Sequence, residues 1–251
     1  MNSKMKVLFL DVENSPNLSY TWGKYEQDVI AFEREWNMLS FAYKWQGTKK
    51  VKAFSLPDFK LYKKDLTNDK ALLVQLWSLL DEADVVIGHN IDRFDIRKIN
   101  ARFLRHGINP PAPYKTVDTL KLSRKYFSLN SNKLNDVSKY LGIGKKVETG
   151  GFSLWLRCMS GDIKAWNTMV KYNKQDVLLL EEVYTHLKSW HTGHPNANLY
   201  NETTHKCPVC AGNTQKRGFL FTRVGKYQRH QCTSCGAWSK GIKVNKDKVI
   251  S

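Results

Sequence analysis

The chain has 251 residues, 41% of them hydrophobic and 12% aromatic, which is enough for one full-sized domain with a packed core and a small additional domain. Its formal net charge of +17 favours a polyanionic partner such as nucleic acid. It has no apolar run long enough to span a bilayer, no basic amphipathic helix of the lipid-binding kind and no secretory signal, so we expect a cytoplasmic protein with no membrane partner.

The predicted elements alternate between strands and helices. Apolar, β-branched and aromatic runs predict four strands, over residues 5–12, 38–45, 50–56 and 85–90. Helical spacing of apolar residues predicts further elements over residues 69–81, 94–106, 115–127 (after a short strand), 133–143 and 162–190. A meander of three strands followed by alternating helices and strands predicts an α/β domain with a mixed sheet flanked by helices.

A polar, turn-rich segment over residues 191–205 has no periodicity and is interpreted as a linker. It would divide the chain into a large domain over residues 1–190 and a small one over residues 206–251. Two cysteine pairs fall in the small domain.

Carboxylates stand at the ends of several predicted elements. Asp11 and Glu13 close the first strand, and because side chains i and i+2 share a face of a strand they point the same way. Asp95 lies where the strand over 85–90 turns into a helix. Asp176 and Tyr172 are four residues apart on the last helix and so share one of its faces. Four carboxylates and one phenol can therefore meet.

Such a cluster is suited to two divalent cations, because Mg²⁺ prefers carboxylate oxygens and two ions can stabilise the attacking and leaving oxygens of a phosphodiester. Each residue taken alone has a simpler interpretation. Asp11 and Glu13 could be solvated at a strand end, Asp95 could cap a helix, and Asp176 could be an exposed helical acid. Asp92 and Asp118 are not predicted as ligands, although Asp118 could support the site from behind.

Three motifs in order resemble those of the DEDD 3′–5′ exonucleases, of the tyrosine branch of the DnaQ-like group: FLDVE, HNIDRFD and YNKQD, read as Asp-x-Glu, Asn-x3-Phe-Asp and Tyr-x3-Asp. The stretches VDTLKLSRKYF and NKLNDVSKYLGI also resemble the region between the second and third motifs. The resemblance covers about residues 5–190 and is strongest to proofreading domains of phage and bacterial family-B-like DNA polymerases. It implies a ribonuclease-H-like fold.

By the same resemblance, Asp11, Glu13, Asp95 and Asp176 would be catalytic ligands of two Mg²⁺ or Mn²⁺ ions. Tyr172 would orient the attacking water, and Asn90 would contact the substrate. The implied activity is hydrolysis of DNA from single-stranded 3′ ends with release of nucleoside monophosphates, in proofreading with a separate polymerase or replication protein or in repair and recombination. A monomer in a bacterial or phage-infected cell is expected.

The two cysteine pairs predict a metal site. Cys207 and Cys210 form one CxxC, Cys232 and Cys235 form the other, and 21 residues separate them. The pairs resemble zinc-ribbon knuckles, and four thiolates would hold one structural Zn²⁺ beside a β-hairpin. A redox pair is the alternative for a single CxxC. The fifth cysteine, Cys158, is interpreted as a packing residue.

The small domain is also rich in basic residues interleaved with aromatic ones, a composition that suits phosphate contacts and base stacking. The basic residues predicted to bind substrate are Lys216, Arg217, Arg223, Lys226 and Arg229. A ribbon that docks on a protein is the alternative.

Other functions remain open at this point. The same site could be an exoribonuclease, and an inactivated nuclease fold could serve as a binding module that recruits a partner through the ribbon. An endonuclease or resolvase on the same fold is disfavoured by the Tyr-x3-Asp helix.

Overall fold

A computed structural model describes residues 5–25, 28–144, 150–201 and 206–244. The chain divides into two compact units. The larger unit comprises Lys6–Lys121 and Leu129–Val183, and the smaller one comprises Met5, Leu122–Ser128 and the described residues from Tyr184 onward. The domain boundaries at residues 190 and 205 stay a prediction.

The larger unit is built on a five-stranded mixed sheet in the order β5-β4-β1-β6-β7. Its strands are β1 (Val7–Asn14), β4 (Met38–Trp45), β5 (Lys52–Ser55), β6 (Val85–Gly88) and β7 (Lys115–Asp118). The pairs β1–β4 and β4–β5 are antiparallel, whereas β6 runs parallel to both β1 and β7. The predicted meander and mixed sheet are thus confirmed.

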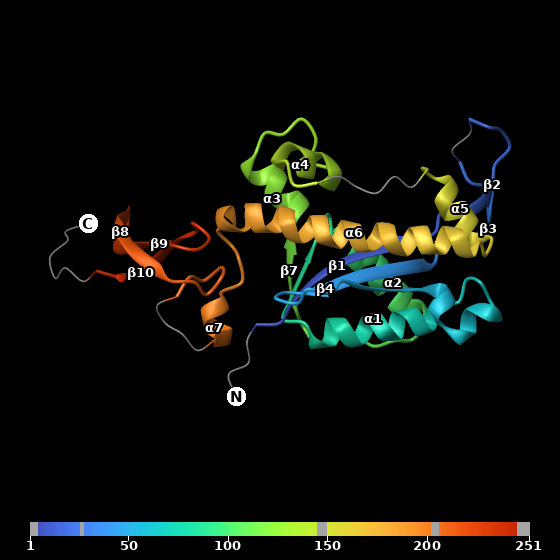
Figure 1. The fold of residues 1–251 in the computed structure, drawn as a ribbon, viewed down its shortest axis with the longest axis horizontal. Helices are drawn as coiled ribbons and strands as arrows, with labels where there is room; N and C mark the ends of the chain where they lie inside the picture. Colours follow the sequence, from blue (N-terminus) through green and yellow to red (C-terminus); the bar gives the residue numbers. More distant parts are fainter. Residues whose placement is uncertain (1–4, 26–27, 145–149, 202–205, 245–251) are drawn as a thin grey trace. The chain divides into compact units, whose positions relative to one another are not determined.

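Helices cover the sheet, and Figure 1 shows α6 and α1 running along opposite sides of β1 and β4. The helices of the chain up to the end of α6 are α1 (Lys70–Glu82), α2 (Asp95–Arg105), α3 (Thr119–Tyr126), α4 (Leu134–Leu141), α5 (Ser153–Met159) and α6 (Ile163–Leu187). Short 3-10 turns occur at Leu56–Asp58, Lys60–Lys63 and Lys188–Trp190.

Strand β1 is buried on both faces, which explains its nearly continuous apolar sequence. Leu8, Leu10 and Val12 pack in one core cluster with residues of α1 and α2. The alternate residues of β1, which include Asp11, point toward α6. An ion pair between Lys44 of β4 and Glu181 of α6 also links that helix to the sheet. The strand therefore buries apolar residues along its length and places its acids beside α6.

Two features of this unit were not predicted. Strands β2 (Leu18–Tyr20) and β3 (Ala31–Arg34) form a separate exposed hairpin, and α5 precedes the long helix. Cys158 on α5 is fully buried in the main core cluster, as predicted. Burial raises the pKa of its thiol to about 12, so the thiol stays protonated at neutral pH.

A buried ion pair joins α1, α2 and β4. Asp69, fully buried just before α1, accepts hydrogen bonds from Nε (2.7 Å) and Nη2 (2.6 Å) of Arg102 and from the backbone N–H of Met38 (2.9 Å). Its Oδ1 also lies 2.7 Å from Nε2 of His106. Bidentate geometry of this kind fixes the relative placement of the two helices.

We expect Asp69→Ala to lower the free energy of unfolding by about 3–5 kcal/mol, because it leaves the buried Arg102 guanidinium without its partner. Urea denaturation measures the change. Glu35→Ala is the matched control, since it breaks a pair with Arg105 in which both side chains are 61% exposed, and it should change little. An equal effect of the two substitutions would contradict this account.

The smaller unit has a second sheet, in the order β10-β9-β8. Its elements are α7 (Ala197–Asn201), β8 (Thr214–Thr222), β9 (Gly225–Cys232) and β10 (Trp238–Lys243). The predicted hairpin is present as β8 and β9, and the structure adds a third strand to it. The segment interpreted as a linker also differs from expectation, because α7 forms within it and Ala197 N–H donates to the carbonyl of Pro208 (2.7 Å).

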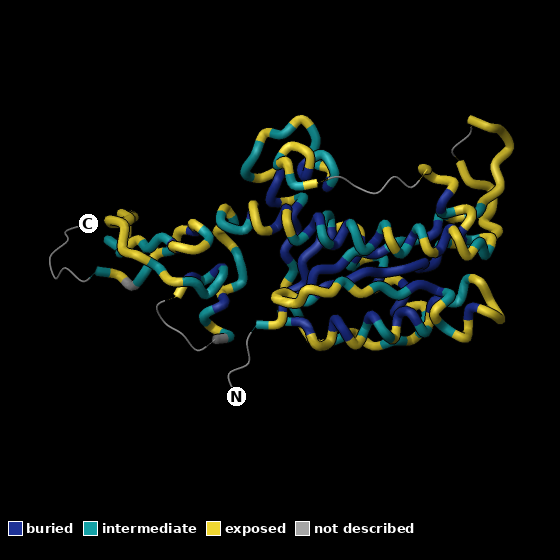
Figure 2. Tube along the Cα trace, viewed as in Figure 1, coloured by how far each residue is buried: buried dark blue, intermediate teal, exposed yellow. Residues whose placement is uncertain are grey.

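Burial differs sharply between the two sheets. Figure 2 shows β1 and β4 almost wholly buried, whereas β8–β10 are intermediate or exposed. The buried cluster around the cysteines consists of Cys207, Val209, Cys232 and Ala237. Four small residues are too little core to stabilise the β8–β10 sheet alone, so something besides apolar packing must hold it.

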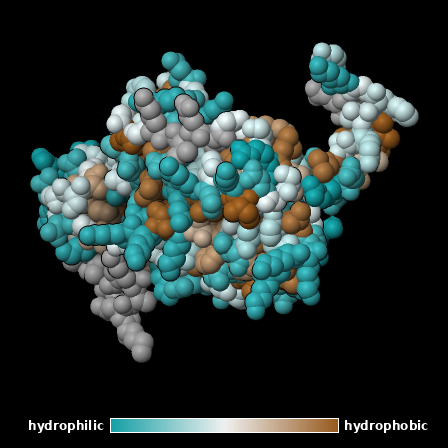
Figure 3. Space-filling view, turned by 45° about the vertical axis from the view of Figure 1, so that its right-hand side comes forward, coloured by the Kyte–Doolittle hydropathy of each residue, from teal (hydrophilic) through white to brown (hydrophobic). Residues whose placement is uncertain are grey.

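The face in Figure 3 is mainly hydrophilic, with hydrophobic side chains in small separate patches. Among the helices that the structure describes, none has the length and apolar character needed to cross a bilayer.

Candidate metal centres

The end of β1 and the middle of α6 bring three acids together. Asp11 and Glu13 stand opposite Ala42 and Ser40 of β4, and Asp176 comes from α6. One carboxylate oxygen from each lies within 4.8 Å of those of the other two. Asp176 is 3% exposed, so this cluster forms in a partly dehydrated place where like charges repel strongly. Divalent cations would relieve that repulsion, and oxygen ligands are what Mg²⁺ and Mn²⁺ prefer.

Tyr172 lies one helical turn before Asp176 and meets the same cluster. Its ring is half-buried and packs edge-on against Trp155, with 6.1 Å between centroids. Burial raises the pKa of the phenol strongly, and the charges of Asp176, Glu13 and Asp11 raise it further. The hydroxyl therefore keeps its proton at neutral pH, so it can orient a water molecule but cannot act as a base.

Asn173, which was not predicted as a site residue, tethers Asp11. It is fully buried, and its Nδ2 donates to Oδ2 of Asp11 at 2.5 Å and to the backbone carbonyl of Asp11 at 3.2 Å. Its Oδ1 in turn accepts from the hydroxyl of Ser40 (3.1 Å). The amide thus fixes one carboxylate oxygen of Asp11 in place. The only signal in the sequence is its place within YNKQD, beside the tyrosine.

We expect Asn173→Leu to weaken Mn²⁺ binding by about 10–100-fold, because partners that orient a metal-binding carboxylate have effects of this size. Isothermal calorimetry measures the affinity, and circular dichroism checks the fold. Lys171→Ala, an exposed position on the same helix, should leave the affinity unchanged. Unaltered Mn²⁺ binding by folded Asn173→Leu would show that the tether has no bearing on the cluster.

Asp95 is buried at the start of α2, outside the group of three carboxylates. It accepts a hydrogen bond from the backbone N–H of Val12, the residue between Asp11 and Glu13. Asp95 therefore lies against β1. Burial raises its pKa to about 7, and the charge of Asp118 contributes to the increase. A nearby cation would return Asp95 to its charged form. Its role as a metal ligand stays a prediction.

Asp118, at the end of β7, holds the turn that leads to Asp95. Its carboxylate accepts from the backbone N–H groups of Asn90 (2.9 Å) and, more weakly, Asp92 (3.4 Å). Asn90 adopts a left-handed backbone conformation (φ 67°), which asparagine tolerates better than most residues. Gly88 is needed in the same turn, because a Cβ there would lie 2.6 Å from Cβ of Ile91. The supporting role of Asp118 that the sequence suggested has this structural basis.

Comparison with known proteins agrees with this architecture. A model of the RNase_H superfamily matches residues 38–188. The chain belongs to the RNase_H superfamily. The match contains Asp95, Tyr172 and Asp176, whereas the β1 acids lie before its first residue.

Two individual proteins are similar to this RNase_H-superfamily chain. The family B DNA polymerase of the hyperthermophilic archaeon Pyrobaculum calidifontis superposes with a TM-score of 0.56 at 15% identity, over 82% of this chain and 26% of the polymerase. At that identity the likeness concerns the fold alone. A 62-residue stretch is 37% identical to Protein NEN3 of Arabidopsis thaliana and makes up 24% of this chain and 12% of NEN3. The chain thus spans only a minor part of each relative.

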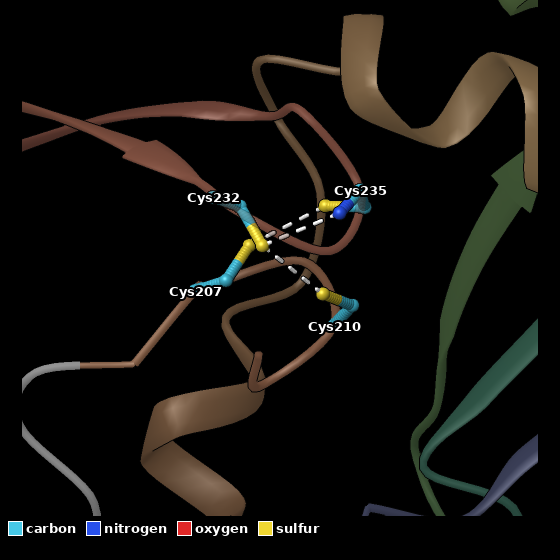
Figure 4. Close-up of side chains that lie close together, drawn as sticks. All are labelled: Cys207, Cys210, Cys232 and Cys235. Atoms are coloured by element: carbon cyan, nitrogen blue, oxygen red, sulfur yellow. Dashed lines mark hydrogen bonds between the residues drawn. The ribbon is translucent and has the colours of Figure 1, made fainter. Parts of the chain in front are cut away.

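The four paired cysteines form a second cluster, beyond the residues that match the superfamily. Figure 4 shows their sulfur atoms converging from two turns. The Sγ atoms of Cys207 and Cys235 are 3.7 Å apart and those of Cys210 and Cys232 are 3.6 Å apart. A Zn–S bond of about 2.3 Å gives a tetrahedron with S–S edges of about 3.8 Å, so the cluster is consistent with zinc. Burial raises the pKa of the Cys207 and Cys235 thiols, and Zn²⁺ would hold them as thiolates.

Both turns have the backbone shape that such a site requires. The N–H groups of Val209 and Ser234 point to the sulfurs of Cys207 and Cys232, each at 3.4 Å. The residue after each pair, Ala211 (φ 56°) or Gly236 (φ 76°), takes the left-handed conformation that closes the turn. Glycine adopts this conformation at no steric cost after the second pair, and alanine fills the same place after the first.

The five basic residues predicted to bind substrate all lie in the smaller unit. Lys216 and Arg217 are on β8, Arg223 is in the turn that follows, and Lys226 and Arg229 are on β9. Their contact with nucleic acid stays a prediction, as does the substrate contact of Asn90.

Proposed function

We propose that the protein is a metal-dependent 3′–5′ exonuclease that hydrolyses single-stranded nucleic acid, DNA in preference to RNA. The observation that carries the proposal is the convergence of Asp11 and Glu13, on the central strand of an RNase H-like sheet, with Asp176 of α6, and Tyr172 lies beside them. The order of the three motifs around these residues supports a terminal over an internal cut.

Asp11, Glu13 and Asp176 would hold two Mg²⁺ or Mn²⁺ ions, with Asp95 completing the set. When bound, the ions would activate water and stabilise the charge that develops on the phosphodiester. Tyr172, kept protonated by its surroundings, accepts a hydrogen bond from the attacking water and so orients it. Asn173 holds Asp11 in place, and Asp118 holds the turn that carries Asn90 and Asp95. No side chain is required as a covalent nucleophile.

One structural Zn²⁺ sits on the four cysteines of a zinc ribbon, whose basic residues help to hold the strand. The chain acts as a monomer, trimming 3′ ends in proofreading beside a separate polymerase or in repair.

Digestion of a single-stranded DNA that carries a label on its last, 3′-terminal nucleotide tests the proposal. With Mg²⁺, the first labelled product should be a nucleoside monophosphate, and a circular strand of the same sequence should stay intact. RNA substrates run in parallel decide between the two polymers. Labelled oligonucleotides as first products would indicate an endonuclease, and binding without cleavage by metal-loaded protein would favour a binding module.

A further inference from the structure

The smaller unit contains a cavity of about 750 Å³. One wall is a face of the β8–β10 sheet, and the other is the segment from His191 to Asn196 together with Pro208 and Val209. The size is within the range of sites that bind small ligands. The segment that the sequence suggested to be a linker is thus part of a wall.

Strand register places a particular set of side chains on this wall. Lys240 pairs with Arg229 and Trp238 pairs with Gln231, and because alternate residues share a face, Arg229, Trp238 and Lys240 project to the same side of the sheet. All three line the cavity. Phe221 pairs with Lys226, which has the opposite parity from Arg229 on β9, so these two side chains project to the other side. Of the five basic residues predicted to bind substrate, Arg229 is a cavity residue.

The chemistry of this wall suits a nucleotide. Trp238 is 53% exposed although it is the largest apolar side chain of β8–β10, and the guanidinium carbon of Arg229 lies 5.3 Å from its ring centroid. Indole and guanidinium planes both stack on bases, and Arg and Lys both neutralise phosphates. Among the residues that the structure describes, none that lines the cavity carries a carboxylate. Indeed, residues 206–244 include eight Lys or Arg and no Asp or Glu, so the local field attracts anions.

The opposite wall offers polar atoms for the base. His194 is fixed, because Nδ1 lies 2.8 Å from the carbonyl of Pro195 and Nε2 lies 2.7 Å from the hydroxyl of Tyr184. Burial lowers the pKa of His194 to about 4, so it stays neutral. His191, which packs edge-on against it, also lines the cavity, and its buried Nδ1 has no hydrogen-bond partner among the described residues. Asn196 is exposed, lines the same wall and can offer its side-chain amide to the edge of a base.

We propose that this cavity binds one nucleotide of a single-stranded nucleic acid, with the base stacked on Trp238 and Arg229 and the flanking phosphates on Arg229 and Lys240. The site would hold the strand through the smaller unit and so deepens the proposed function, on which it rests for the identity of the polymer. Stacking is tolerant of sequence, so different bases should bind with similar affinity.

The test is equilibrium binding of fluorescein-labelled dT12 and mixed-sequence DNA and RNA 12-mers, followed by anisotropy. It uses the full zinc-loaded chain carrying Asp176→Asn, so that no strand is cut. We expect Trp238→Ala and Arg229→Ala each to raise Kd by about tenfold. Phe221→Ala, the matched control, removes an aromatic side chain that is 71% exposed on the other side of the sheet and should leave Kd within about twofold.

Salt dependence separates the two kinds of contact. Lys240→Ala should reduce the slope of log Kd against log salt by about one unit or less, whereas Trp238→Ala should leave that slope unchanged. Equal weakening by Trp238→Ala and Phe221→Ala, or no weakening by Trp238→Ala with zinc retained, would overturn the proposal. Failure of the wild-type chain to bind any of these strands would also overturn it and would point to a protein ligand.

These results are distinguishable from failure of the proposed function. Binding that depends on Trp238 in a chain with no nuclease activity would leave the nucleotide site standing and remove the exonuclease. If the chain cleaves nucleic acid but Trp238→Ala does not change Kd, the exonuclease is supported and the nucleotide site is ruled out.

Discussion

Asp176→Asn should reduce the rate of nucleic acid hydrolysis by at least about 10³-fold. The substitution keeps the shape of the side chain and removes one of three converging negative charges. Losing about 4 kcal/mol of transition-state stabilisation, a reasonable share for a ligand of a catalytic cation, corresponds to this factor. Single-turnover rates with Mg²⁺ measure the effect. Glu182→Gln, an exposed change of the same chemical kind on the same helix, should have no effect.

Asp176→Asn should lower activity without lowering the stability of the metal-free protein. Without metal, the three carboxylates repel one another, so Asp176→Asn should leave the melting temperature of the metal-free protein unchanged or raise it. Loss of activity together with a lower melting temperature would indicate that Asp176 supports the fold and not the reaction. Retained activity would remove Asp176 from the site.

Removal of zinc should unfold β8–β10 and leave the larger unit folded. The buried cluster at the cysteines has four residues, two of them cysteines, so metal ligation supplies most of the stability. Structural zinc contributes on the order of 10–16 kcal/mol in small zinc domains. The larger unit has its own extensive core around β1 and β4 and does not depend on it.

Hydrogen exchange followed by mass spectrometry measures the protection of backbone amides in each unit. After chelation, or in Cys232→Ser, amides of residues 214–243 should exchange rapidly, while those of Val7–Asn14 keep their protection. Native mass spectrometry should find one zinc per wild-type chain and per Cys158→Ala chain, since Cys158 lies in the other core. Protection of β8–β10 that persists in zinc-free protein would contradict a structural metal.

The sequence predicts the larger sheet well because its strands are buried and strongly patterned. Strand β1, for example, is a nearly unbroken apolar run that ends in acids, and the long helix α6 has a sustained periodicity. The hairpin of β2 and β3 escaped prediction because it is short and mostly exposed, with no apolar alternation. Strand β10 escaped because six residues interrupted by Gly241 give too weak a pattern.

Contacts between distant residues account for most of what the sequence did not predict at the site. The tether from Asn173 to Asp11 joins residues 162 positions apart, and the bond from Ser40 to Asn173 joins residues 133 apart. Apart from its place beside Tyr172 in YNKQD, nothing in the local pattern distinguishes Asn173 from any other polar helical residue. By contrast, Asp11, Glu13, Tyr172 and Asp176 could be predicted, because strand and helix periodicity alone set the faces they occupy.

The cavity of the smaller unit illustrates the same limit. The sequence identified the ribbon as basic and aromatic, but which basic residue shares a face with Trp238 depends on the register of β9 with β10. A bulge in each strand pair shifts that register, so parity along the sequence does not carry from one strand to the next.

We propose that Asp11, Glu13 and Asp176 form a divalent-metal centre. Anomalous diffraction from crystals soaked in Mn²⁺, recorded on both sides of the manganese absorption edge, tests it most directly. We expect manganese peaks among these three carboxylates, and a second peak that touches Asp95 would add that residue to the ligand set. A saturated soak with manganese elsewhere in the crystal and no peak at the three carboxylates would contradict the account.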